Sequence, residues 1–398
     1  GTCWTHGTMA AIEGNLLVNG NWSAAGETGE PDLAEYHLDW WNGFNEHHNP
    51  DLSPPSGSGL SVHYGGDYLV AAAYISRGHG PVRDSDGQSF DTPPQLTAPH
   101  YHTYYCREIV WHRAKSDSGR INRIKRALMN QGVVGTCMYY NSGLYDNQTN
   151  SHFQPPSDYN NPNHAIAIIG WDDQKQTAAS LDGAWLCKNS WGNNWGDNGF
   201  FWISYFDKHS GRHPEMGAVS FQNTELFSYN RVYFHDYHGW RRTLQNTTEA
   251  VNAFTTVANE VLSAVSFYTA ADSVSYTIAV YSDFDGSQLS GLLTRQTGFS
   301  ARTGFHTIDL EHRVILRTND RFFIYLALSR GGHPYDCSKE VKVLLGSNMQ
   351  GVMVESRADP GESFYRTADG WSDLQTVDTT ANFCMKALTV DTSATIGI

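Results

Sequence analysis

A cysteine stands third in the chain, in the opening stretch GTCWTHGTMAAIEGNLLVNG. Apolar residues then recur every three or four positions up to Leu16, and Gly20 is placed to end a helix. A helix over 3–18 would put the Cys3 thiol at its N-terminus, where the positive end of the helix dipole favours the thiolate. Because the thiolate is the form of cysteine that attacks carbonyl carbon, Cys3 is a candidate nucleophile.

Two later stretches supply the partners that a cysteine nucleophile needs. His164 precedes the alternating apolar residues of NHAIAIIGWDD, and Asn189 ends the apolar stretch AWLCKN. An asparagine oxygen can accept a hydrogen bond from an imidazole and fix its orientation, and Trp191 could keep water away from that bond. Each of these residues taken alone is more often structural, and a lone cysteine is usually a buried apolar side chain.

Composition narrows the class of protein. The chain has 398 residues, of which 40% are hydrophobic, enough for two or three domains with sizeable cores. Its formal net charge of -14 and the absence of a basic run argue against nucleic acid as a partner. No apolar stretch reaches the roughly 18 residues of a membrane-spanning helix. Six cysteines without a CxxC pair favour neither a disulfide scaffold nor a zinc site, so we expect no metal and no cofactor.

The elements that must position the three residues change in character along the chain. Apolar stripes predict helices over 67–76 and 118–131. Strands follow, in VVGTCMYY, HAIAIIGW, AWLCKNSW and GFFWISYF. This order is typical of an α+β domain whose two lobes meet at a cleft, and we assign it to 1–222.

The remainder, 223–398, alternates short apolar stretches with turns and predicts a separate all-β sandwich. The expected strands are VLSAVSFYT, SYTIAVYS, GFHTIDL, RFFIYLALS, VKVLLG and ANFCMKALTV.

Together, the three motifs resemble the papain family of cysteine proteases. GTCW is similar to the nucleophile motif, NHAIAIIGW to the histidine strand and KNSWGNNWGDNGFFWIS to the asparagine segment. The resemblance covers about 1–222 and implies a helical lobe and a β-barrel-like lobe. It assigns catalysis to Cys3, His164 and Asn189. A thiolate paired with an imidazolium would attack a peptide carbonyl, and water would then hydrolyse the acyl-enzyme.

The same resemblance suggests where a substrate would bind. HYGGDYLV is similar to a glycine pair of the family, so Gly65 and Gly66 would bond the substrate backbone as an added strand. A tight turn before a helix would account for both glycines equally well. We place Trp191 with them in the substrate-binding set, and QGVVGTCMYY resembles a strand of the S2 wall.

Several features depart from the family pattern. The intervals from Cys3 to His164 and from His164 to Asn189 are longer than usual, which predicts extended loops around the cleft. The excess is expected in 42–60, 141–162 and 172–183. Asn163 stands where many members of the family carry an acid.

A further departure concerns the oxyanion donors. The family has a glutamine shortly before the nucleophile, where this chain has only Gly1 and Thr2; the other donor is the backbone N–H of Cys3. Losing one donor costs roughly 10²- to 10³-fold in rate. We therefore expect either an impaired enzyme or a partner, namely a cleaved N-terminal fragment of the same precursor that carries the glutamine.

Residues from about 224 to 390 resemble the lectin-like domain that follows papain-type proteases in bacterial and archaeal surface proteins. The resemblance implies a secreted or cell-surface protein with a carbohydrate as a further partner. Trp240 and Trp371 could stack on a sugar ring, although tryptophan is normally core in a sandwich. Asp283 and Asp285 could help to hold calcium, although DFDG is also an ordinary turn. The two cysteines of this domain, Cys337 and Cys384, could form a disulfide.

Two hypotheses of function follow. The first is a cysteine endopeptidase that hydrolyses protein or peptide substrates and uses the sandwich as an accessory domain. The alternative is a catalytically impaired protease-like surface protein, structural or carbohydrate-binding. Acyl transfer to an amine is a weaker third option, because it uses the same acyl-enzyme. The complete set of Cys3, His164 and Asn189 favours hydrolysis.

Overall fold

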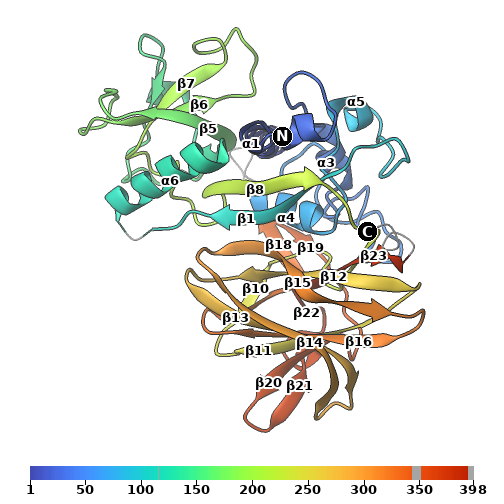
Figure 1. Ribbon diagram of the computed structural model, residues 1–398. Helices are drawn as coiled ribbons and strands as arrows, with labels where there is room; N and C mark the ends of the chain where they lie inside the picture. Colours follow the sequence, from blue (N-terminus) through green and yellow to red (C-terminus); the bar gives the residue numbers. More distant parts are fainter. Residues whose placement is uncertain (115, 343–350, 393–398) are drawn as a thin grey trace.

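The protein consists of a domain of helices and strands above a β domain (Figure 1). Its structure, a computed structural model, describes residues 1–114, 116–342 and 351–392. No helix in these three segments combines the length and the apolar character needed to cross a membrane.

The predicted helices are confirmed. α1 (Cys3–Asn19) is buried over most of its length and ends at Gly20, whose φ of 74° closes the last turn. α4 (Tyr68–Ser76) begins after Asp67, whose side chain accepts a backbone N–H of the first helical turn. α6 (Asp117–Gln131) begins in the same way after Ser116. The shorter helices are α2 (Asn21–Ala24), α3 (Glu35–Trp41), α5 (Asp84–Gly87), η1 (Ser142–Leu144) and η2 (Leu374–Thr376).

The four strands predicted for the first domain are also confirmed, as β2, β5, β6 and β7. In the sheet they are joined by β8 and β1, which were not predicted, in the order β7, β6, β5, β2, β8 and β1. His164 is the first residue of its strand, where it pairs with Met138. This strand packs against α1. The strands are β1 (Tyr104–Trp111), β2 (Val134–Met138), β3 (Tyr145–Asp146), β4 (Ser151–His152), β5 (His164–Asp172), β6 (Ala184–Lys188), β7 (Phe200–Ser204) and β8 (Ala218–Leu226).

The second domain is a sandwich. A six-stranded sheet, β14-β13-β16-β11-β20-β21, packs over β15, β12, β23 and β9 through a core that includes Phe267, Ile278 and Ile324. Of the expected VKVLLG strand, residues 343–346 lie outside the described residues. The strands are β9 (Arg231–Tyr233), β10 (Arg242–Leu244), β11 (Glu249–Thr255), β12 (Glu260–Thr269), β13 (Val274–Phe284), β14 (Leu289–Ser300), β15 (Gly304–Leu316), β16 (Arg321–Leu328), β17 (His333–Asp336), β18 (Lys339–Lys342), β19 (Gly351–Val354), β20 (Ser363–Thr367), β21 (Gly370–Asp373), β22 (Asn382–Phe383) and β23 (Met385–Asp391).

One sheet runs through both domains. β1 pairs with β8 on one side and with β15 on the other, where Glu108 is opposite His306 and Val110 is opposite Gly304. The result is a 12-stranded sheet. The sandwich is therefore confirmed, and one of its sheets continues the sheet of the first domain through the β1–β15 pair. The disulfide that Cys337 and Cys384 could have formed is not present, because both are buried free thiols.

Candidate active site

Cys3 is held where α1 meets β5. It is the first residue of the helix, it is 8% exposed, and its Sγ accepts the backbone N–H of Ala165 at 3.2 Å. Ala165 directly follows His164, so this contact fixes the sulfur beside the histidine. The next residue, Trp4, is 1% exposed and anchors the start of the helix in the core.

His164 and Asn189 form the hydrogen bond that the sequence predicts. Nε2 of His164 lies 2.7 Å from Oδ1 of Asn189. Because an amide oxygen can only accept, Nε2 carries the hydrogen, and Nδ1 keeps a lone pair. Asn189 Oδ1 also accepts the Ser190 N–H at 2.8 Å, which holds the amide in place.

Trp191 covers this hydrogen bond. Its indole stacks on the His164 ring with centroids 4.4 Å apart and an interplanar angle of 22°, while 41% of the residue stays exposed. Tyr140 packs edge-on against the indole at 4.6 Å. The tryptophan therefore limits access of water to the His164–Asn189 pair and still presents a surface to the cavity.

A cavity of about 380 Å³ opens in front of these residues. It brings Cys3, His164 and Trp191 together, with Asn189 directly behind His164. The sequence motifs include neither His6 nor Tyr36, although His6 lies one turn after Cys3 on the predicted helix and so shares its face. Tyr140 ends QGVVGTCMYY, the stretch that resembles a strand of the S2 wall. The lining consists of Gly1, Thr2, Cys3, His6, Tyr36, Tyr140, Asn163, His164, Ser190 and Trp191.

The glycine pair lies in the loop before α4, outside the described lining of this cavity. Gly65 has a φ of 114°, which favours glycine. Gly66 is pressed against the indole of Trp4, since a Cβ there would come within 2.6 Å of Trp4 Cε2. This contact ties the loop to the residue next to the candidate nucleophile, and binding of substrate by the two glycines stays a prediction.

Burial controls the charges of the site. Loss of water raises the pKa of the Cys3 thiol to about 11, although the Ala165 N–H opposes the shift. Loss of water likewise lowers the pKa of His164 to about 4, against the effect of the hydrogen bond to Asn189. Burial therefore outweighs the helix dipole and favours a neutral thiol beside a neutral imidazole. Thiolate and imidazolium form most readily together, because each supplies the opposite charge that stabilises the other.

The remaining residues from the sequence analysis have local partners. The carboxylate of Asp285 accepts hydrogen bonds from Ser287 and Gln288, as in an ordinary turn, and Asp283 accepts one from Ser290. Trp240 is half-buried and donates to Thr243. Trp371 packs edge-on against Phe284. Sugar stacking by these tryptophans and calcium binding by the two aspartates stay predictions.

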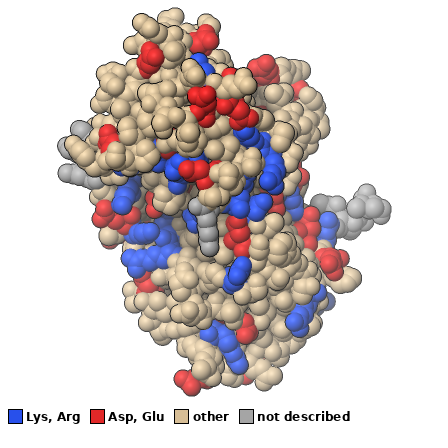
Figure 2. All heavy atoms as spheres, turned by 90° about the vertical axis from the view of Figure 1, so that its left-hand side faces the viewer, with Lys and Arg blue, Asp and Glu red and all other residues tan. Residues whose placement is uncertain are grey.

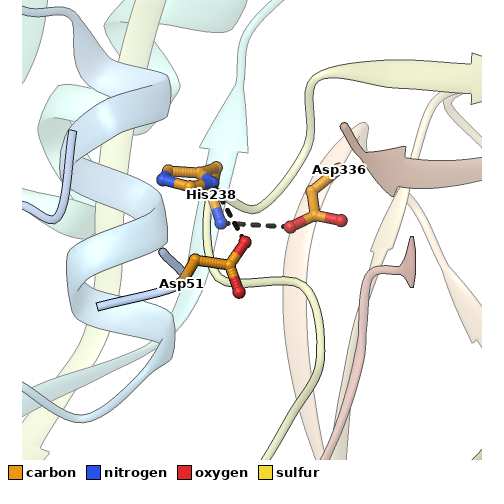
Figure 3. Close-up of side chains that lie close together, drawn as sticks. All are labelled: Asp51, His238 and Asp336. Carbon is orange, nitrogen blue, oxygen red and sulfur yellow. Dashed lines mark hydrogen bonds and ion pairs between the residues drawn. The ribbon is translucent and has the colours of Figure 1, made fainter. Parts of the chain in front are cut away.

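A different group of side chains comes close together where the domains meet. Asp51, His238 and Asp336 have ligand atoms within 4.8 Å of one another, in the part of the chain that the structure describes (Figure 3). Nδ1 of His238 lies 2.7 Å from Ser356 Oγ and Nε2 lies 3.1 Å from the Gly43 carbonyl, so both ring nitrogens have partners. The loop 42–60, expected to extend around the cleft, is thus used to dock the second domain.

The two carboxyl groups of this cluster repel each other. Burial raises the pKa of Asp51 to about 7, and burial together with the charge of Asp51 raises that of Asp336 well above its usual range. Asp51 accepts the backbone N–H of Arg357 at 2.7 Å. The interface therefore retains a proton at pH values where an exposed aspartate has lost it.

Replacing Asp51 by asparagine should make the thermal stability less dependent on pH. A raised folded pKa contributes stability that is complete below the unfolded value of 3.8 and is lost as pH rises through about 7. Asparagine carries no charge and keeps an oxygen for the Arg357 N–H. Its melting temperature should therefore exceed that of the native protein by about 2 °C at pH 8 and match it near pH 4. The control is Asp369→Asn, at an exposed turn. A lower melting temperature of the Asp51 variant at pH 8 would contradict the repulsion.

Comparison with known proteins agrees with this geometry. Residues 65–218 match the papain family cysteine protease pattern, and residues 232–389 match the lectin like domain. The chain therefore combines a papain-like cysteine protease domain with a lectin-like domain. Pro-cathepsin H of Bos taurus is 27% identical over 209 residues, which are 51% of this chain and 53% of that protein. Cysteine proteinase 1 of Entamoeba histolytica is 26% identical over 221 residues, 50% of this chain and 56% of that protein.

The chain spans about half the length of the curated relatives it matches. Among solved structures, a clostridial cysteine protease, Cwp84, after propeptide cleavage has a TM-score of 0.77 at 21% identity and covers 98% of this chain and 94% of that one. The protease and lectin-like domains of Cwp84, a surface layer associated protein of Clostridium difficile, give 0.76 at 21%, covering 98% and 84%. These likenesses show the two-domain fold.

Proposed function

We propose that the protein is a cysteine endopeptidase in which Cys3 is the nucleophile, His164 the acid and base, and Asn189 the residue that orients the imidazole. The observation that carries this proposal is the 2.7 Å hydrogen bond between His164 and Asn189, formed next to the residue whose N–H binds the Cys3 sulfur. This bond leaves Nδ1 of His164 as the nitrogen with a free lone pair on the cavity side.

Proton transfer between Cys3 and His164 defines the first step. The proton of the Cys3 thiol passes to Nδ1 of His164 as the sulfur attacks the peptide carbonyl, so the two charges arise together. The imidazolium then gives this proton to the leaving amine, and an acyl-enzyme forms. Water adds to the acyl carbon with His164 as the base and releases the thiol. Asn189 keeps the ring in one tautomer throughout, and Trp191 limits water around their hydrogen bond.

The oxyanion needs donors in the same cavity. Cys3 begins α1, so its backbone N–H is not used within the helix and can bind the developing charge. The family pattern places a glutamine amide as the second donor. Support for a second donor of this kind comes from the resemblance of the nucleophile motif alone.

The proposal extends to the site of action and to the second domain. We infer that the protein works outside the cell or on its surface, supported by its fold likeness to a surface layer associated protein. We also propose that the lectin-like domain binds carbohydrate. Support comes from the domain match and from a cavity of about 420 Å³ whose lining includes Tyr233, Phe234 and Phe254.

Labelling with a peptidyl epoxide, followed by mass mapping, tests the peptidase. Cys3 should be modified because its sulfur faces a substrate-sized cavity, and a thiolate that forms beside His164 opens the epoxide. The other five cysteines are buried free thiols and serve as internal controls. Modification of another thiol while Cys3 stays unmodified would favour the alternative, a surface protein that retains a protease-like body without its chemistry.

A further inference from the structure

A second cavity, of about 410 Å³, lies where α6 meets the lectin-like domain. Arg123 and Arg126 come from α6, His112 follows β1, and Arg302 comes from the turn between β14 and β15. Figure 2 looks onto this side of the molecule, where Lys and Arg side chains gather across the waist between the domains. A chain with a formal net charge of -14 thus places three arginines around one cavity.

Only part of this positive charge is neutralised. Asp272 lies 2.7 Å from Arg123 and 3.7 Å from Arg302, and its other oxygen accepts the Thr303 N–H at 2.9 Å. Arg126 is exposed and has no polar partner among the residues that the structure describes. Asp272 offsets one of the three charges, and the described lining contains no carboxylate.

His112, one of the residues that line the cavity, carries a buried ring nitrogen without a partner. Nε2 of Gln222 donates to Ser220 Oγ at 2.6 Å, and this hydroxyl lies 2.7 Å from Nε2 of His112. Ser220 Oγ accepts from Gln222, and its own hydrogen has no acceptor other than His112 Nε2 among the described residues, so the serine donates to Nε2 and the ring hydrogen is on Nδ1. His112 is 7% exposed, and Nδ1 has no hydrogen-bond partner in the structure. A buried N–H of this kind is costly unless something accepts it.

We propose that this interdomain cavity binds an oxyanion, a carboxylate or phosphate group, between Arg126, Arg302 and the Nδ1–H of His112. Guanidinium groups bind such anions through paired, charge-assisted hydrogen bonds. The neutral ring of His112 contributes a donor that needs no proton from solution. Because the site joins α6 to the turn before β15, an anion bound here contacts both domains at once.

Two kinds of ligand carry such an oxyanion: a free inorganic anion and the acidic unit of an anionic polysaccharide. Isothermal titration calorimetry of the full chain at low ionic strength, with inorganic phosphate and with a galacturonic acid trimer as probes, separates the two. We expect saturable binding of at least one of them, and no heat from a neutral galactose trimer. Tighter binding of the trimer by about tenfold or more identifies the polysaccharide, and equal or weaker binding identifies the free anion.

Arg126→Gln should weaken binding by roughly ten- to a hundredfold, because it removes a charge-assisted donor that holds nothing else in the described structure. Arg302→Gln should act in the same direction from the other domain. Arg313→Gln is the matched control, since Arg313 is exposed on β15 outside the described lining. The proposal fails if neither anion binds at low ionic strength, or if Arg126→Gln binds as tightly as the native protein and the Arg313 control.

Discussion

Replacing Cys3 by serine should lower kcat/KM for a fluorogenic peptide by at least about a thousandfold. The serine hydroxyl occupies the same place, but it gives up its proton to His164 far less readily than a thiol does. Water cannot make up for this difference in acidity, because the Cys3 residue is 8% exposed and His164 is 4% exposed. The variant should fold normally, since the replaced atom makes one hydrogen bond, with the Ala165 N–H, and oxygen can accept it.

Cys106→Ser provides the matched control for this variant. Cys106 lies in β1, is fully buried, and accepts a hydrogen bond from Thr224 Oγ1, so the same atom is changed away from the cavity. Its kcat/KM should equal that of the native protein. If the Cys3 variant still hydrolyses the peptide, another residue is the nucleophile. The roles proposed for His164 and Asn189 would then be wrong as well.

The parts of the site that the sequence predicts are those fixed by local pattern. Helical spacing after Cys3 indicates a helix that begins at the thiol, and alternation after His164 indicates a strand that begins at the imidazole. Turn residues and tryptophans around Asn189 complete the third motif. The contact between the three segments cannot be read from any one of them, and it follows from their resemblance to a family in which they meet.

Other features depend on tertiary packing and cannot be predicted from the sequence. The helix dipole is a local property and predicts a thiolate at Cys3, whereas burial of the sulfur against β5 raises the pKa of the thiol. The loop 42–60 is polar and rich in glycine and proline, which indicates a loop but not the surface that it contacts. β1 and β15 are far apart in the sequence, and the residues of neither strand predict that the two strands pair.

Replacing Gly304 by alanine should disrupt this pairing between the domains. Gly304 begins β15 with a φ of 152°, and a Cβ there would lie 1.9 Å from the Ile109 carbonyl oxygen of β1. Because that oxygen belongs to the backbone, it cannot move away without opening the strand pair. We expect the free energy of unfolding to fall by about 3 kcal/mol or more, measured by urea denaturation.

Gly370→Ala separates the clash from the backbone strain. Gly370 has a φ of 132°, and a Cβ there would meet no atom within 4 Å, so alanine adds strain without a collision. It should lower the free energy of unfolding by about 1–2 kcal/mol.

Protease cleavage near residue 230, between the matched domains, should increase in the Gly304 variant alone. Activity per folded molecule should persist, because β5 reaches β1 through β2 and β8, and these pairs do not involve β15. Equal losses in the two variants would mean that the shared sheet is not what holds the domains together, and that the docked loop 42–60 carries the interface instead.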